Sequence, residues 1–204
     1  MNRIIDPLRE MGAKIAGTKS GTAPLTIEPV PTLHAITYDM PVASAQVKSA
    51  ILLAGLYADG ITTVREQVLT RDHTEKMMGL TTRYENGFWI VSVEGGKKLE
   101  PQHYIVPGDT SAAAFLMVAA AIVPNSDILI RTVGLNSTRT AFIDVLKSLG
   151  ANIQIENLQK TGGEEIGDIR VKSSELHGDL KLQGKVVASV IDEIPILTIA
   201  GLFA

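Results

Sequence analysis

Three apolar segments of this chain, at residues 44–61, 111–128 and 190–204, share one pattern. The first two are offset by 67 residues throughout. The third matches the first best at residues 200–204, AGLFA, which correspond to residues 54–58, AGLYA. A chain in which the same apolar segment occurs three times is expected to fold as repeated structural units.

A second motif recurs between the apolar segments and supports the same repeat. Its glycines are Gly12, Gly79 and Gly150, which lie 67 and 71 residues apart. Repeat periods of this length indicate supersecondary units that stack on one another to bury a shared core.

Each unit can be drafted from its local pattern. The apolar segment is hydrophobic nearly all round, which predicts a buried helix. A β-branched strand such as 127–133 follows, and then an amphipathic helix, 140–150, with Gly150 where a left-handed cap would fall. Two strands come next, because residues 80–95 carry the hairpin signal Asn86-Gly87 at their centre.

The predicted fold is therefore α/β (α+β), made of repeated β-α-β-α-β-β units. The chain begins inside a helix of the amphipathic type and stops at Ala204 on an apolar helix. Bare apolar surface is unusual at the end of a domain. We expect a segment of a longer repeat protein, incomplete at both ends.

Composition excludes several classes of protein. The net charge is −3 and no basic block occurs, which argues against a nucleic-acid-binding protein. The chain has no cysteine, so disulfides and thiolate zinc sites are impossible, which fits a reducing cytoplasm. The longest apolar run, 112–123, is too short to span a bilayer, and the N-terminus lacks an apolar signal core. We expect a soluble, cytoplasmic protein.

The start of each buried helix carries the polar groups of interest. A helix N-terminus offers free N–H groups and a partial positive charge, which together favour an anion. Ser44 is placed either to cap its helix or to bind a phosphate oxygen, and Gln46 must find a hydrogen-bond partner if the helix is buried. The equivalent position of the third copy holds Asp192, either a partner of the helix dipole or a proton carrier.

A second polar cluster occupies residues 70–75, before an amphipathic helix. Arg71 could bind a phosphate through two parallel hydrogen bonds, although an ordinary charged helix start would have the same sequence pattern. Residues 136–139 indicate another capped helix start, with Arg139 exposed. The four histidines show no metal-ligand spacing, so we expect no metal site.

Five ordered motifs together resemble the 5-enolpyruvylshikimate-3-phosphate (EPSP) synthase family, the 3-phosphoshikimate 1-carboxyvinyltransferases. They lie at residues 41–56, 70–78, 106–122, 133–151 and 191–204. The resemblance implies two lobes of three β-α-β-α-β-β units each, with buried helices directing their N-termini into the cleft between the lobes. By this alignment residues 1–105 belong to the first lobe and residues 106–204 to the second.

The resemblance also implies the reaction. The 5-hydroxyl of shikimate 3-phosphate attacks the central carbon of phosphoenolpyruvate, and the tetrahedral adduct then loses phosphate. No cofactor or metal is implied, and the full-length enzyme is expected to be a monomer. Further cationic motifs of the family would precede Met1 or follow Ala204, so we expect the isolated 204-residue chain to be inactive.

Site residues follow from the same resemblance. Ser44 and the N–H of Ala45 match the contact to the shikimate phosphate, and Gln46 matches an amide that touches shikimate 3-phosphate beside phosphoenolpyruvate. Thr70, where the family usually has serine, and Arg71 match further phosphate contacts.

Asp192 matches the carboxylate that hydrogen-bonds the shikimate hydroxyls and is the leading proton shuttle. Two alternatives remain at this point. One is the sister enolpyruvyl transferase that acts on UDP-N-acetylglucosamine, and the other is a non-catalytic repeat module that binds a phosphorylated ligand.

Overall fold

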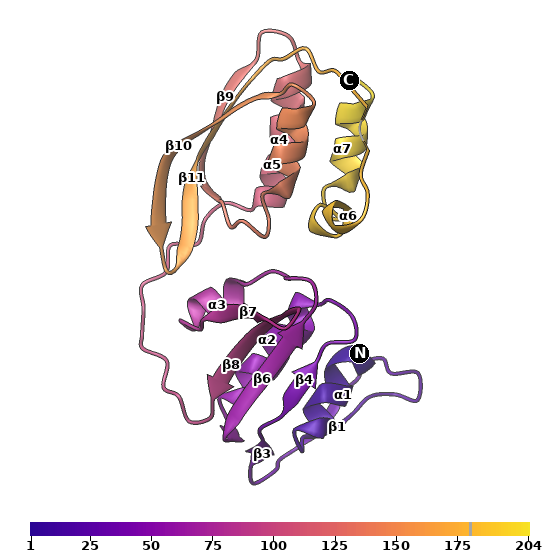
Figure 1. Cartoon of the computed structure of the whole chain (residues 1–204), viewed down its shortest axis with the longest axis vertical. Coiled ribbons are helices and arrows are strands. Elements are labelled where there is room, and N and C mark those ends of the chain that lie inside the picture. Colours follow the sequence, from indigo (N-terminus) through magenta and orange to yellow (C-terminus); the bar gives the residue numbers. More distant parts are fainter. Residues whose placement is uncertain (180) are drawn as a thin grey trace. The chain divides into compact units, whose positions relative to one another are not determined.

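The computed structural model describes residues 1–179 and 181–204. The chain divides into two compact units, Met1–Pro101 and Gln102–Ala204, which are described separately (Figure 1). Within the described residues, no helix combines the length and the apolar character needed to cross a membrane.

The first unit is built on a four-stranded sheet with the order β4-β6-β8-β7. Strand β4 runs parallel to β6, and β6, β8 and β7 are antiparallel neighbours. Helix α2 packs on β6 and β8, and α1 packs on α2. The elements of this unit are α1 (Asn2–Glu10), β1 (Lys14–Ala16), β2 (Thr26–Glu28), β3 (Leu33–His34), β4 (Thr37–Asp39), α2 (Ala45–Gly55), β5 (Ala58–Asp59), β6 (Ile61–Glu66), α3 (His73–Met77), β7 (Thr82–Glu85) and β8 (Phe88–Glu94).

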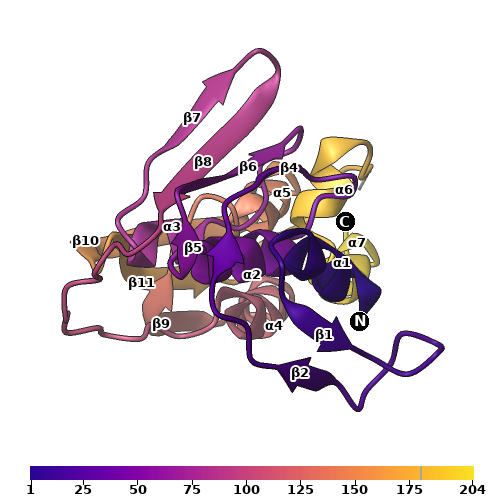
Figure 2. The same ribbon diagram turned by 90° about the horizontal axis from the view of Figure 1, so that it is seen from below.

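Two small two-stranded sheets complete this unit. The hairpin β1–β2 lies beside α1, well away from the β7–β8 hairpin in the view of Figure 2. The pair β3–β5 is parallel. The core between α2 and the main sheet contains Ile51, Leu52, Val64, Val91 and Val93, all almost fully buried.

The second unit has a three-stranded antiparallel sheet with the order β10-β11-β9. Helix α4 contacts both this sheet and α7, which explains why it is apolar nearly all round. The elements are α4 (Thr110–Ile122), β9 (Asp127–Gly134), α5 (Ala141–Ser148), β10 (Asn152–Thr161), β11 (Glu164–Lys172), α6 (Lys185–Ser189) and α7 (Ile194–Gly201).

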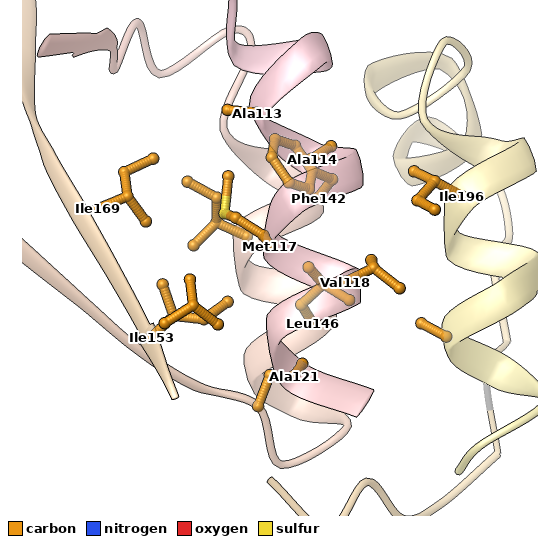
Figure 3. Packing of buried hydrophobic residues seen from close by; sticks show 14 of the residues in the cluster. Ala113, Ala114, Met117, Val118, Ala121, Phe142, Leu146, Ile153, Ile169 and Ile196 are labelled. Atoms are coloured by element: carbon orange, nitrogen blue, oxygen red, sulfur yellow. The ribbon is translucent and has the colours of Figure 1, made fainter. Parts of the chain in front are cut away.

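Figure 3 shows the core of the second unit, where side chains from α4 and α5 meet strands β10 and β11. Met117 and Phe142 are fully buried between the helices and the sheet, and Leu146 is buried beside them. Ile153 and Ile169 face them from the two strands. Continuous burial of this kind holds the N-termini of α4 and α5 in fixed positions within the unit.

The predicted repeat is confirmed by strand pairing. In the first unit β6 pairs with β8, and β8 pairs with β7; in the second, β9 pairs with β11, and β11 pairs with β10. Each set is a strand, a helix and then a hairpin whose second strand takes the central place. A parallel bridge from Gly108 to Val133 across α4 corresponds to the parallel pairing of β4 with β6 across α2.

Glycines mark the same points of the repeat. Gly12, Gly79 and Gly150 all have positive φ, of 89°, 61° and 90°, directly after the amphipathic helices. The left-handed cap predicted at Gly150 is therefore present. The predicted turn at Asn86-Gly87 is also confirmed, since both residues have positive φ between β7 and β8.

The third apolar segment forms a shorter helix than the sequence suggests. Helix α7 begins at Ile194, although the apolar pattern extends back to Val190. A five-residue helix, α6, ends at Ser189, and a turn over residues 190–193 separates it from α7. Helices α2 and α7 nevertheless end at Gly55 and Gly201, the pair that the AGLYA and AGLFA motifs align.

Candidate phosphate-binding site

Helix α2 has an open N-terminus of the kind that binds anions. Ser44 is its N-cap in an extended conformation, with φ −155° and ψ 108°. The first intrahelical bond runs from the N–H of Lys48 to the carbonyl oxygen of Ser44, at 3.1 Å. The N–H groups of Ala45 and Gln46 precede that bond, so they project from the positive end of the helix dipole.

Ser44 can serve both predicted roles at once. Its Oγ accepts a long hydrogen bond of 3.4 Å from the N–H of Val47, which is the capping interaction. This bond uses an oxygen lone pair and leaves the hydroxyl hydrogen to be donated to another group. Capping and phosphate binding by Ser44 are therefore compatible.

Gln46 corrects part of the sequence interpretation. Its side chain is exposed, so burial does not force it to find a protein partner. The reason is its place in the first turn, where a side chain points away from the body of the helix even though Val47 and Lys48, the next two residues, are buried.

A buried ion cluster lies directly behind this helix start. Lys48 is fully buried, and Glu66 and Glu75 are 3% and 2% exposed. The Lys48 ammonium lies 2.7 Å from Oε1 of Glu66 and 2.7 Å from Oε1 of Glu75. The sequence indicated neither glutamate, although a lysine inside an apolar helix was the signal that could have prompted a search for buried carboxylates.

The ion cluster ties the predicted Thr70–Arg71 segment to α2. Lys48 Nζ donates to the carbonyl oxygen of Thr70 at 3.4 Å. The Thr70 hydroxyl donates to Oε2 of Glu66 at 2.7 Å, and its N–H donates to Oε1 at 3.2 Å. Arg71, which is half-buried, follows at once. Of the residues predicted for the site in the first unit, Ser44, Ala45 and Gln46 therefore lie at the start of α2, and Thr70, which precedes Arg71, is tied to the same helix through Lys48.

Asp192 belongs to the second unit, where it lies in the turn immediately before α7 and is exposed. The sequence placed it inside the first turn of a buried helix. The N-cap is instead the next residue, Glu193, which is 3% exposed and accepts a short hydrogen bond from the Ser111 hydroxyl. Asp192 thus stands at the N-terminal end of α7 with its side chain at the surface.

The surroundings of Glu193 correct one further expectation. Arg139 was expected to be exposed, but only 16% of its side chain is accessible. Its guanidinium donates to Ser111 Oγ and lies 3.5 Å from Asp109 and 4.0 Å from Glu193. These contacts join the starts of α4 and α7 to the segment that leads into α5. Across the described ranges, no group of three or more histidine, aspartate or glutamate side chains is arranged to hold a metal ion.

Comparison with known proteins now identifies the family. The sequence model of EPSP synthase, 3-phosphoshikimate 1-carboxyvinyltransferase, matches residues 1–204. The chain belongs to the EPSP synthase family. The 3-phosphoshikimate 1-carboxyvinyltransferase of Crocosphaera subtropica is 48% identical over 208 residues, covering 100% of this chain and 46% of the relative. That of Geobacillus kaustophilus is 50% identical over 201 residues, covering 98% of this chain and 47% of the relative.

Solved structures confirm the enolpyruvyl transferase fold. EPSP synthase from Acinetobacter baumannii superposes with a TM-score of 0.85 at 46% identity, covering 98% of this chain and 46% of that one. The enolpyruvyl transferase NikO from Streptomyces tendae has a TM-score of 0.68 at 16% identity, which shows a shared fold alone. This member of the EPSP synthase family spans about half the length of the relatives it matches.

Proposed function

We propose that this chain provides part of an EPSP synthase, which transfers the enolpyruvyl group of phosphoenolpyruvate to the 5-hydroxyl of shikimate 3-phosphate and releases phosphate. The observation that carries the proposal is the N-terminus of α2. In a chain of this family, the free N–H groups of Ala45 and Gln46 and the Ser44 hydroxyl lie there, and Lys48 ties the segment that leads into Arg71 to the same helix.

The chemistry of that point suits a phosphate dianion. Two N–H groups at a helix N-terminus and a hydroxyl with a free hydrogen supply neutral donors. An arginine can add two charge-assisted hydrogen bonds. We assign the Ser44, Ala45 and Arg71 contacts to the 3-phosphate, and the exposed amide of Gln46 to the shikimate ring beside phosphoenolpyruvate. We assign no phosphate contact to Thr70, because its hydroxyl hydrogen is donated to Glu66, and the contact predicted from the sequence is untested.

Asp192 is proposed to accept hydrogen bonds from shikimate hydroxyls and to carry the proton lost by the 5-hydroxyl as it attacks. Its exposure leaves the carboxylate accessible to a ligand. A general base must lie within hydrogen-bond distance of the proton that it removes. The Asp192 carboxylate must therefore come within that distance of the 5-hydroxyl when the substrates are bound.

The remaining proposals concern the whole protein. Residues 1–105 and 106–204 are assigned to the first and second lobes of an EPSP synthase, with a boundary close to the division at Pro101 and Gln102. We propose a cytoplasmic location, a monomeric full-length enzyme and no cofactor. The 204-residue polypeptide alone is expected not to turn over, because it spans less than half of each relative's length.

A ligand panel tests the assignment. Thermal unfolding of the chain is followed with shikimate 3-phosphate, shikimate, inorganic phosphate and UDP-N-acetylglucosamine at equal concentrations. A ligand that binds only the folded state raises the Tm in proportion to its affinity, so shikimate 3-phosphate should raise it most. The Gln46→Ala variant should show a smaller rise with the same ligand.

Two outcomes would contradict the proposal. A larger rise with UDP-N-acetylglucosamine would indicate the sister enolpyruvyl transferase. Equal rises with shikimate 3-phosphate and inorganic phosphate would indicate a general phosphate-binding module, because the shikimate ring would then contribute nothing.

A further inference from the structure

The buried cluster behind α2 treats its two glutamates unequally. Both carboxylates lie 2.7 Å from the Lys48 ammonium, and both are almost fully buried. Glu66 uses both oxygens to hold Thr70, one for the backbone N–H and one for the hydroxyl. Within the described residues, by contrast, neither oxygen of Glu75 accepts a hydrogen bond, and its contact with Lys48 is one of charge and proximity.

The position of Glu66 makes its hold on Thr70 significant. Glu66 is the last residue of β6 and pairs with Trp89 of β8, so the sheet fixes its backbone. Residues 67–72 form an irregular connection to α3. Ordering such a connection costs about 1–2 kcal/mol of conformational free energy per residue, which a ligand must otherwise supply on binding. Two hydrogen bonds from a fixed strand end to Thr70 order the connection in advance.

We propose that Glu66 is a positioning residue of the phosphate site, acting through Thr70 to hold Arg71 beside the N-terminus of α2. This inference rests on the proposed function for the identity of the ligand. In this account the Thr70 hydroxyl is a structural link to Glu66, because its single hydrogen cannot be donated to the buried carboxylate and to a phosphate at once. Lys48 balances the charge of Glu66 and reaches the Thr70 carbonyl oxygen from the other side.

The two glutamates provide a matched pair of variants. Glu66→Gln and Glu75→Gln remove the same charge from the same buried cluster, but only Glu66→Gln replaces an oxygen that accepts a hydrogen bond from Thr70. The amide exchange rates of Thr70 and Arg71 are measured by NMR in the unliganded chain, and the Kd for shikimate 3-phosphate is measured by calorimetry.

Glu66→Gln should speed exchange at both amides and weaken the Kd by about tenfold, which is the usual loss for a hydrogen bond to a charged group. Glu75→Gln should leave both within about twofold of the wild-type values, whatever it does to the Tm, because it touches neither amide. Equal effects of the two variants would overturn the proposal and leave the cluster a purely structural feature.

A second pair avoids the buried charges, in case Glu66→Gln does not fold. Thr70→Val removes the hydroxyl and keeps the shape, and should speed exchange at Arg71 before any ligand is added. Thr70→Ser restores the hydroxyl and should restore slow exchange. If Thr70→Val weakens binding without changing exchange in the unliganded chain, Thr70 contacts phosphate directly and the positioning role is wrong. If the wild-type chain binds no shikimate 3-phosphate, the proposed function fails, and the exchange measurements still decide the role of Glu66.

Discussion

Replacing Lys48 with methionine should unfold the first unit at much lower urea concentration than wild type. Lys48 is fully buried and is the cation shared by Glu66 and Glu75. Removing one partner of a buried ion pair leaves uncompensated charge in the interior, which costs about 3–5 kcal/mol. Here two carboxylates would remain together without their cation, so we expect the upper part of that range.

The sole tryptophan, Trp89, makes this measurement specific to the first unit. Its fluorescence is followed during urea unfolding of the wild type, of Lys48→Met and of Lys98→Met, whose lysine is exposed in the same unit. Lys98→Met should behave as wild type. Adding Glu66→Gln and Glu75→Gln to Lys48→Met should recover part of the loss, because the buried charges are then gone. Equal midpoints for Lys48→Met and Lys98→Met would show that the ion cluster contributes little.

Phe142→Ala should have a comparable effect on the second unit. The Phe142 ring is fully buried between α4, α5 and the sheet (Figure 3). Truncating a buried phenylalanine removes its transfer free energy and leaves a cavity, at a cost of about 3–5 kcal/mol. The same truncation at Phe115, which is 53% exposed on α4, provides the control and should cost little.

Amide exchange along β11 reports this loss directly, because β11 is the central strand of the second sheet. In Phe142→Ala the amide of Ile169 should lose several orders of magnitude of protection, as about 1.4 kcal/mol corresponds to each factor of ten. In Phe115→Ala its exchange should hardly change. Similar protection in the two variants would mean that the second unit is not organised around this core.

Much of the fold could be predicted from local chemistry. Asn86-Gly87 between two strand-like runs is a strong signal for a tight hairpin turn, which the structure has. Gly150 follows a helix and adopts the left-handed conformation that glycine favours there. The repeated apolar segments predicted helices packed on both sides, which holds for α4 between its sheet and α7. These features depend on neighbours in sequence, so the pattern alone was sufficient.

Contacts between distant residues were beyond the same reasoning. Lys48 pairs with Glu66 and Glu75, but nothing in the spacing selects these two from the 22 acidic residues of the chain. Arg139 was expected at the surface because a charged helix start usually is, but its partner Ser111 lies 28 residues away in the chain, at the start of another helix. The partners of Lys48 and Arg139 depend on the tertiary fold, so these parts of the site could not be predicted from the sequence.

The predicted start of α7 was wrong for a different reason. Hydrophobicity continues from Val190 through Ile191, so the pattern shows no break where the structure has a turn. The helix begins only at Ile194, and this moves Asp192 from the first turn of a helix to the exposed segment before it. Helix boundaries are the least certain part of any pattern-based prediction, and here the boundary sets the environment of a candidate proton carrier.

The central claim is that the N-terminus of α2 and the adjoining Arg71 bind the phosphate of shikimate 3-phosphate. Residue-resolved amide NMR of the ¹⁵N-labelled chain, titrated with that ligand, tests it most directly. The account predicts saturable shifts that are largest at the amides of Ala45, Gln46 and Arg71. Saturable shifts confined to other segments, with these three amides unmoved, would contradict it.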